Sequence, residues 1–241
     1  MSATIEFILG QLRVVNDERA RRKLVPGLDA KVARLKEYQQ RRFLCTYADL
    51  LVSTRYAATA RFFLDELYGP SDFTDRDEQF ARVVPTLVRL FPREIVETVA
   101  ALAELHALSE SLDTEMALHL ADTCVGAGAY VHAWQRTGRA SDRQRQIALT
   151  LAVANRLDGL TRKPMLRSSL RLMRGAARVA GLGALQGFLE AGFDTFRAMN
   201  GAKEFVALIG SRERAFAAAL FRSIIAVDAE APIDPALACL P

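Results

Sequence analysis

Cysteine is scarce in this 241-residue sequence, and its scarcity excludes two kinds of protein. The three residues, Cys45, Cys124 and Cys239, are odd in number, far apart and outside any CxxC arrangement. Small disulfide-rich domains and structural zinc sites both need closely and regularly spaced cysteines. The pattern therefore argues against a disulfide framework and against a zinc site, and we expect the cysteines to be inert thiols.

Long hydrophobic runs are also missing. No stretch approaches the roughly 18 consecutive apolar residues of a membrane span. The start, MSATIEFILGQLRVV, lacks the basic region and the small-residue cleavage site of a secretory signal. We therefore expect a cytoplasmic protein without a transmembrane segment. The 32 basic and 28 acidic residues leave a net charge of only +4, so nucleic acid is not an expected partner.

Strand patterns are absent as well. No sustained alternation of β-branched residues occurs, whereas most segments between Pro and Gly repeat apolar residues every three or four positions. This predicts an all-α fold, a single multi-helix bundle of about seven to ten helices for which globin-sized orthogonal packing is one form. We expect one domain over residues 1–227 and a flexible tail over 228–241. The first two helices are expected at 4–22 and 29–52.

Motifs of catalysis are the last absence. The sequence contains no GxxxxGK[ST], no GxGxxG after a strand, no HExxH, no GxSxG and no paired ExxH. The nearest metal-like spacing, Glu115 to His119, is a single pair that arises often by chance. We therefore assign no catalytic residue and no metal ligand, the sequence leaves any cofactor unknown, and a non-enzymatic protein is favoured over an enzyme.

The most informative stretch that is present runs from Ala60 to Asp113. On the helix predicted after Pro92, His106 shares an arc with Ile95, Val99 and Leu102, so we expect it to face the core. Glu110 and Asp113 follow His106 on the same line and could share one partly buried surface with it. Two interpretations stay open, a hydrogen-bonded core histidine with Asp113 capping the next helix, or a ligand pocket.

A second helix pattern adds two residues to the candidate pocket. Met116, Leu120, Cys124, Ala127, Val131 and Trp134 repeat at helical spacing, with His119 and Tyr130 on the flank of this stripe. Gly126 and Gly128 interrupt its composition. Glycine inside a helix is unfavourable by about 1 kcal/mol relative to alanine, so close approach of another helix or of a ligand is expected there.

The strongest charge pattern lies after Pro164. Arg167, Arg171, Arg174 and Arg178 form one line along a predicted helix, about 100° from an apolar line of Leu166, Leu170, Met173 and Ala177. Four guanidinium groups in a row could bind an acidic protein, phosphates or an anionic membrane surface. The alternative is a solvated face whose arginines pair with acidic residues of neighbouring helices. No aromatic residues alternate with the arginines, as base stacking would require.

The segments ARFFLDELYGP, LHALSESLD and FRAMNGAKEF resemble a family of uncharacterised, predicted all-helical bacterial proteins. The resemblance covers residues 41–221. It implies an α-helical domain and a bacterial cytoplasmic origin, and it implies no activity, cofactor or catalytic residue.

Three functions are compatible with these observations. The first is a non-enzymatic binding or regulatory module that engages a protein or an anionic partner through the arginine line, and that could also form homo-oligomers. The second is a sensor or carrier of a small apolar or tetrapyrrole-like ligand, with a pocket near His106; this is an analogy at the level of the fold. The third is an enzyme that uses His106, Glu110 and Asp113.

Overall fold

Helices make up nearly all of the computed structural model, which describes residues 2–66, 74–121, 125–223 and 234–241. The elements are α1 (Ser2–Leu24), α2 (Leu28–Thr46), α3 (Ala48–Val52), α4 (Ala57–Glu66), α5 (Thr74–Leu90), α6 (Arg93–Leu118), α7 (Ala127–Thr137), α8 (Ala140–Thr161), α9 (Pro164–Val179), α10 (Gly183–Ala198), α11 (Lys203–Arg222) and the short 3₁₀ helix η1 (Pro235–Leu237). The predicted all-α class is confirmed.

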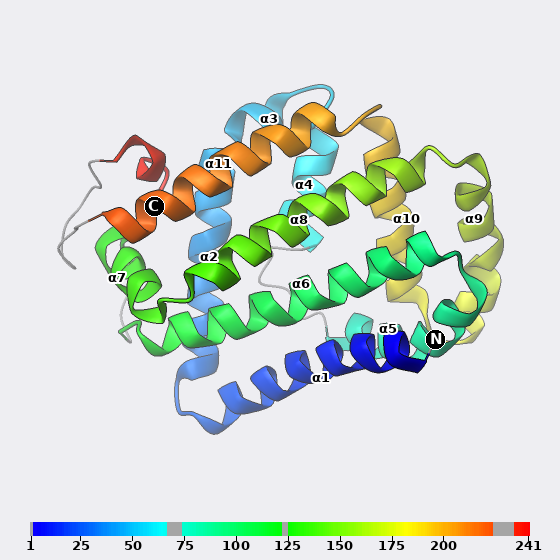
Figure 1. Ribbon diagram of the computed structural model, residues 1–241, viewed down its shortest axis with the longest axis horizontal. Coiled ribbons are helices and arrows are strands. Elements are labelled where there is room, and N and C mark those ends of the chain that lie inside the picture. Colours follow the sequence, from blue (N-terminus) through cyan, green and yellow to red (C-terminus); the bar gives the residue numbers. More distant parts are fainter. Residues whose placement is uncertain (1, 67–73, 122–124, 224–233) are drawn as a thin grey trace.

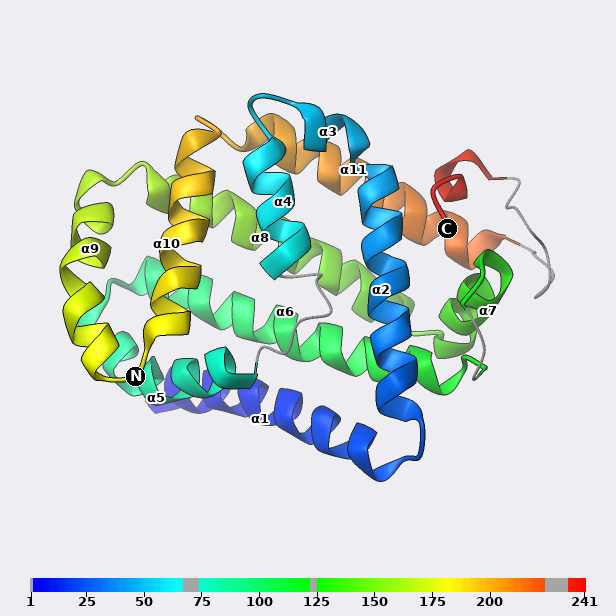
Figure 2. The same ribbon diagram turned by 180° about the vertical axis from the view of Figure 1, so that it is seen from behind.

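The long helices form two crossing sets (Figure 1). The helices α1, α6, α8 and α11 run along the length of the molecule, each packed beside the next in that order. Seen from behind, α2, α4 and α10 cross this layer (Figure 2). The helices α7 and α9 lie at opposite ends of the molecule. The crossing of the two sets agrees with the orthogonal packing that the sequence suggested.

The interior consists of three apolar clusters between these sets. One is rich in aromatic residues and joins α2, α7 and α11 around Tyr38, Tyr130, Trp134 and Phe216. A second lies among α2, α4, α10 and α11, and the third joins α1, α5 and α6. Because amphipathic helices bury one stripe each, crossing helices supply several stripes to one cluster.

The described residues contain eleven α-helices, one more than the upper end of the expected number. The difference arises because the helix predicted over residues 29–52 divides at Tyr47 into α2 and α3. Tyr47 is fully buried, and its hydroxyl donates a hydrogen bond to Glu213 on α11 over 2.5 Å. This tertiary contact overrides the local helical pattern.

The helix α6 is longer than the sequence pattern indicated. We expected Asp113 to cap a following helix, but it lies inside α6, which continues to Leu118. The continuation is favoured by Leu112, Met116 and Ala117, which are fully buried there. The stripe predicted from Met116 to Trp134 is therefore shared by α6 and α7, and its member Cys124 falls outside the described residues. A side chain at Gly126 would meet nothing within 4 Å, so no close approach explains this glycine.

The expectation of a loose tail is wrong for residues 234–241. Leu237 is fully buried and Leu240 nearly so, both in the aromatic cluster. Asp234 caps the 3₁₀ helix by accepting a hydrogen bond from the N–H of Ala236. Residues 228–233 of the expected tail lie outside the described residues. The two buried leucines therefore anchor this segment to the protein, which its proline-containing sequence did not indicate.

The expectation of inert thiols is wrong for two of the cysteines. Cys45, near the end of α2, and Cys239 form a disulfide with their Cα atoms 5.4 Å apart. Their sequence separation of 194 residues leaves no local motif, so only the fold brings them together. Cys124 lies outside the described residues. The bond ties the C-terminal segment to the helical body.

Candidate functional site

The predicted line of His106, Glu110 and Asp113 lies on α6, where His106 contacts α5 and the two carboxylates contact α1 and α2. Glu110 and Asp113 are buried, whereas the side chain of His106 keeps 22% of its surface exposed. The sequence thus placed all three on one partly buried surface. It did not reveal their partners, which come from α1, α2 and α5.

Glu110 lies between two cations. Nη1 of Arg22 on α1 is 2.6 Å from Oε2 of Glu110, and Nζ of Lys36 on α2 donates to Oε1 over 2.8 Å. Burial opposes ionisation of this carboxyl, but the charges of Lys36 and Arg22 outweigh it and lower the pKa of Glu110 to about 2. Glu110 is therefore ionised at neutral pH and joins three helices.

Arg22 is itself buried and uses its other donors on the same helix. Its Nε donates to Oγ1 of Thr114 over 2.8 Å, and its Nη2 donates to the carbonyl of Glu110 over 2.7 Å. A buried guanidinium is tolerated only when it is paired and hydrogen-bonded, and Arg22 meets both conditions.

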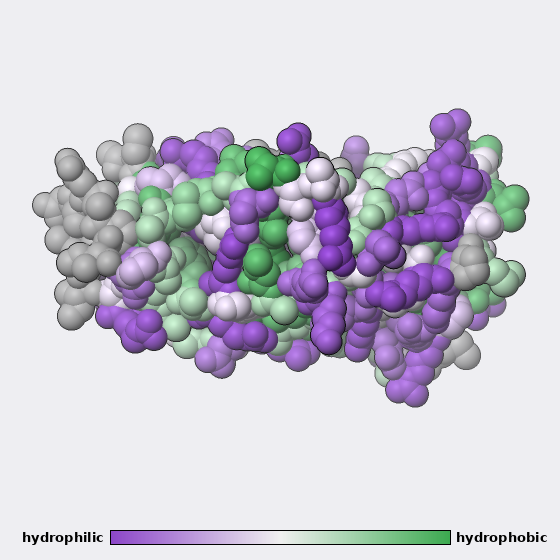
Figure 3. Space-filling view, turned by 90° about the horizontal axis from the view of Figure 1, so that it is seen from above, coloured by the Kyte–Doolittle hydropathy of each residue, from purple (hydrophilic) through white to green (hydrophobic). Residues whose placement is uncertain are grey.

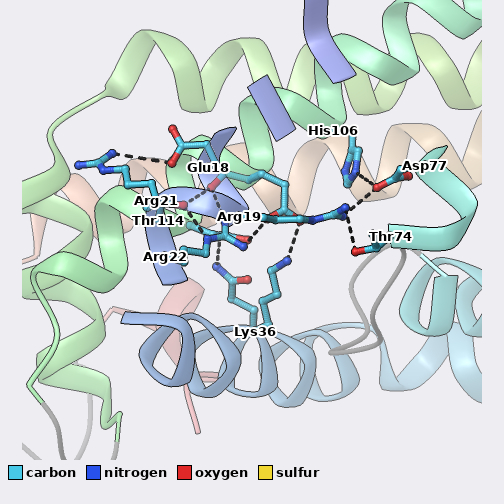
Figure 4. A network of polar contacts seen from close by, with 12 residues as sticks. Glu18, Arg19, Arg21, Arg22, Lys36, Thr74, Asp77, His106 and Thr114 are labelled. Atoms are coloured by element: carbon cyan, nitrogen blue, oxygen red, sulfur yellow. Dashed lines mark hydrogen bonds and ion pairs between the residues drawn. The ribbon is translucent and has the colours of Figure 1, made fainter. Parts of the chain in front are cut away.

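His106 is paired with Asp77 on α5. Its Nε2 lies 2.9 Å from Oδ2 of Asp77, and Nη2 of Arg19 reaches the same oxygen over 2.8 Å (Figure 4). Burial opposes ionisation of Asp77, but the hydrogen bond from His106 and the charges of His106 and Arg19 lower its pKa. A histidine–carboxylate pair can transfer protons, but here Arg19 neutralises the carboxylate and the pair joins α1, α5 and α6.

Asp113 completes the row by accepting a hydrogen bond from Nε2 of Gln39 on α2 over 3.1 Å. Each member of the predicted line thus has a partner inside the protein. We call the set Arg19, Arg22, Lys36, Asp77, His106 and Glu110 the internal charge network. Within the described ranges, no group of three or more His, Cys, Asp or Glu side chains could hold a metal ion.

The other two residues predicted for the pocket lie apart from this network. His119 is exposed at the C-terminal end of α6. Tyr130 is buried on α7, where it stacks on Tyr38 with ring centroids 4.8 Å apart, and burial raises its pKa. The charge of Asp113 also raises the pKa of Tyr130, so these two residues lie near each other, but His119 is exposed at the end of α6 and the five predicted pocket residues do not share one site.

The arginine line on α9 divides into two pairs. Arg167 is buried and donates to Asp194 of α10 over 2.5 Å, while Arg174 binds both oxygens of Glu190 and lowers the pKa of that carboxyl to about 2. Arg171 and Arg178 are exposed, and neither makes an ion pair with any described residue. Half of the predicted anion-binding line thus holds α9 onto α10, and half is exposed.

The same helix carries an apolar line that the sequence reasoning missed. Met165, Leu172 and Val179 expose 80%, 84% and 92% of their surfaces. Their seven-residue spacing is present in the sequence, but the line of Leu166, Leu170, Met173 and Ala177 gives a stronger helical pattern, and only the fold shows that the first line is exposed. At the end of the molecule where α9 lies, hydrophobic and hydrophilic side chains adjoin on the surface (Figure 3). We call Met165, Leu172, Val179, Arg171 and Arg178 the α9 outer face.

The fold and these two features define an all-α protein with an internal charge network and one exposed amphipathic helix. Its chain belongs to the family described as Domain of unknown function (DUF8198), whose model matches residues 18–224. The match includes the whole charge network and α9. No curated protein and no solved structure matches the chain. Among helices of the described residues, none has the length and apolar character needed to cross a membrane.

Proposed function

We propose that this chain is a non-enzymatic binding module whose α9 outer face engages an acidic amphipathic helix of a protein partner. The observation that carries the proposal is the exposure of Met165, Leu172 and Val179 on one line beside two arginines without partners among the described residues. Soluble proteins rarely expose several large apolar side chains on one line, and such patches commonly mark interaction sites.

The spacing of the line favours a helix as the occupant. Residues seven apart lie on one seam, which here extends about 21 Å along α9. Ser169 and Ala176 lie between the large residues Met165, Leu172 and Val179 of the seam. Because their side chains are small, a second helix can approach α9 closely at these positions. A helix that lies on a membrane surface instead presents a wide apolar face, which this narrow seam does not provide.

Charge further specifies the partner. Arg171 and Arg178 lie on one side of the seam, separated from it by the small residues Ser168 and Gly175. Long arginine side chains can therefore extend toward carboxylates of a bound helix. An antiparallel second copy of the chain would bring two arginine flanks together, so charge disfavours that form of homo-oligomer.

A labelled synthetic peptide with leucines at heptad spacing and glutamates beside them serves as the probe, and fluorescence anisotropy measures its affinity. We expect binding that weakens with salt, and a loss of about tenfold in Arg171→Glu/Arg178→Glu. The double variant should then prefer a peptide that has lysines in place of the glutamates. Arg13→Glu/Arg89→Glu is the matched control, because it changes net charge equally at exposed arginines of α1 and α5.

Other occupants give different results. Equal loss in the control variant would reduce the effect to net charge and contradict the proposal. Binding to vesicles of anionic lipid without binding to the peptide would replace the helix by a membrane surface. A dimer that dissociates on Leu172→Ser, seen by light scattering, would replace it by a second copy.

The expectations of a bacterial and cytoplasmic origin stay predictions. The Cys45–Cys239 disulfide bears on the second, because disulfides persist mainly in oxidising compartments. Binding is therefore measured with and without a thiol reductant.

A further inference from the structure

A polar pocket opens where the C-terminal ends of α8 and α10 meet the beginning of α11. It encloses about 350 Å³, within the range of small-molecule sites. Its lining consists of Asp158, Thr161, Arg162, Phe196, Arg197, Asn200 and Gly201. None of these residues belongs to the α9 outer face or to the internal charge network.

The loop between α10 and α11 gives the pocket its shape. Asn200 and Gly201 both have positive φ angles, 52° and 114°, which turn the chain sharply between the two helices. A side chain on Gly201 would lie 3.5 Å from Nη2 of Arg162 and 3.6 Å from Nη2 of Arg55. Two guanidinium groups therefore flank the same glycine.

The positive charges at the pocket exceed the negative ones. Arg55 is engaged by Glu204 and by the carbonyls of Met199 and Gly201. Arg162 pairs with Asp158 through Nη2 alone, and 66% of its side chain is exposed. Arg197 lines the pocket and is exposed, and its side chain makes no hydrogen bond or ion pair with any described residue. Arg162 and Arg197 thus retain donors for a ligand.

The carboxylate of Asp158 is already used on both sides. Its Oδ2 accepts from Arg162, and its Oδ1 accepts from the N–H of Ala202 just before α11. Asp158 therefore holds Arg162 beside the loop. Lys203, the first residue of α11, and the N-terminal dipole of that helix add positive potential, whereas the C-terminal dipoles of α8 and α10 oppose it, so the charged side chains decide the sign of the potential there. Four cations, Arg55, Arg162, Arg197 and Lys203, are thus balanced by only two carboxylates, Asp158 and Glu204. A bound anion would relieve the repulsion between these cations.

We infer that this pocket binds the phosphate group of a small phosphorylated metabolite. A phosphate monoester carries a charge near −2 at neutral pH, which matches the excess of cations, and guanidinium groups bind phosphate oxygens in pairs. Arg162 and Arg197 are the direct donors, and the remaining volume beside Phe196 accommodates the rest of the molecule.

Titration of the ¹⁵N-labelled full chain with glucose 6-phosphate tests the inference, with inorganic phosphate and glucose as companion probes. We expect glucose 6-phosphate and phosphate, but not glucose, to shift the amide signals of Asn200 and Gly201. Arg197→Ala and Arg162→Gln should each weaken binding about tenfold or more, the usual effect of removing a charged hydrogen bond. Arg145→Ala is the matched control, because Arg145 is an exposed arginine of α8, the helix that ends just before Arg162, and it is paired with Glu104.

We expect the Arg197→Ala variant to fold, because the Arg197 side chain makes no hydrogen bond or ion pair with any described residue. A loss of binding in this variant therefore reports on contacts with the ligand. Circular dichroism of each variant checks that it is folded. Absence of any shift at Asn200 and Gly201 at millimolar glucose 6-phosphate would overturn the inference. So would affinities that stay unchanged in both pocket variants, or that fall equally in Arg145→Ala.

Discussion

Two arginines of α1, Arg19 and Arg22, and two arginines of α9, Arg171 and Arg178, have opposite fates although both pairs lie on helices that are rich in arginine. Arg19 and Arg22 of α1 lie between helices and are neutralised by Asp77 and Glu110. Arg171 and Arg178 of α9 are exposed. The difference follows from position, because α1 is covered by α2, α5 and α6, whereas in the described part of the chain α9 packs mainly on α10 and α8. A row of arginines therefore becomes structural or available according to what covers its helix.

The largest expected effect concerns the covered side of this comparison. Glu110→Ala leaves Arg22 buried without its carboxylate, so we expect a loss of about 3–5 kcal/mol in the free energy of unfolding. Urea denaturation followed by circular dichroism measures it. Glu104→Ala, on the same helix but paired with the exposed Arg145, is the control and should change stability by less than about 1 kcal/mol. Equal losses in the two variants would contradict the distinction between buried and exposed pairs.

The second prediction concerns the Cys45–Cys239 disulfide, which holds the C-terminal segment at the end of the molecule opposite α9 (Figure 1). Cys45→Ser removes the link to Cys239 and should lower the free energy of unfolding by about 2–4 kcal/mol under oxidising conditions. Addition of dithiothreitol should bring the parent to the stability of the variant, because both then lack the bond. A difference that persists in dithiothreitol would indicate an effect of the serine itself.

Acid should weaken the internal charge network before it affects the α9 outer face. The pKa of Glu110 is about 2 in the folded chain and 4.5 without its surroundings, so its stabilisation is complete above the higher value and disappears as pH falls toward the lower. We expect a loss of about 2 kcal/mol between pH 7 and pH 3 from this group. The lowered pKa of Asp77 acts in the same direction. Glu110→Gln should show a shallower dependence on pH, and identical profiles would contradict this origin.

The smallest effect is expected on the exposed side. Leu172→Ala removes a side chain that is 84% exposed, so the free energy of unfolding should change by no more than about 0.5 kcal/mol. Leu112→Ala, at a fully buried position of α6, should lower it by about 2–5 kcal/mol. Thermal denaturation of both variants gives the contrast. A large loss in Leu172→Ala would mean that the α9 outer face is covered in the native protein.

Local patterns predicted the helices well where one stripe of a helix is buried by ordinary packing. The left-handed turn at Asn200–Gly201 and the breaks at Gly138 and near Pro164 are local conformational preferences, readable from a few adjacent residues. The placement of His106, Glu110 and Asp113 on one side of α6 likewise follows from helical geometry alone.

The sequence by itself thus determined the all-α class, most helix positions and the residues that share a helix face, because these depend on neighbours within a few positions. Only the tertiary structure decided that Tyr47 divides a helix, that Cys45 meets Cys239, and that Arg167 and Arg174 are paired while Arg171 and Arg178 have no ion pair among the described residues. Each of these outcomes depends on a partner far away in the chain or on which helix covers another. A partner of that kind leaves no trace in the spacing of nearby residues, so the helical pattern could not reveal it.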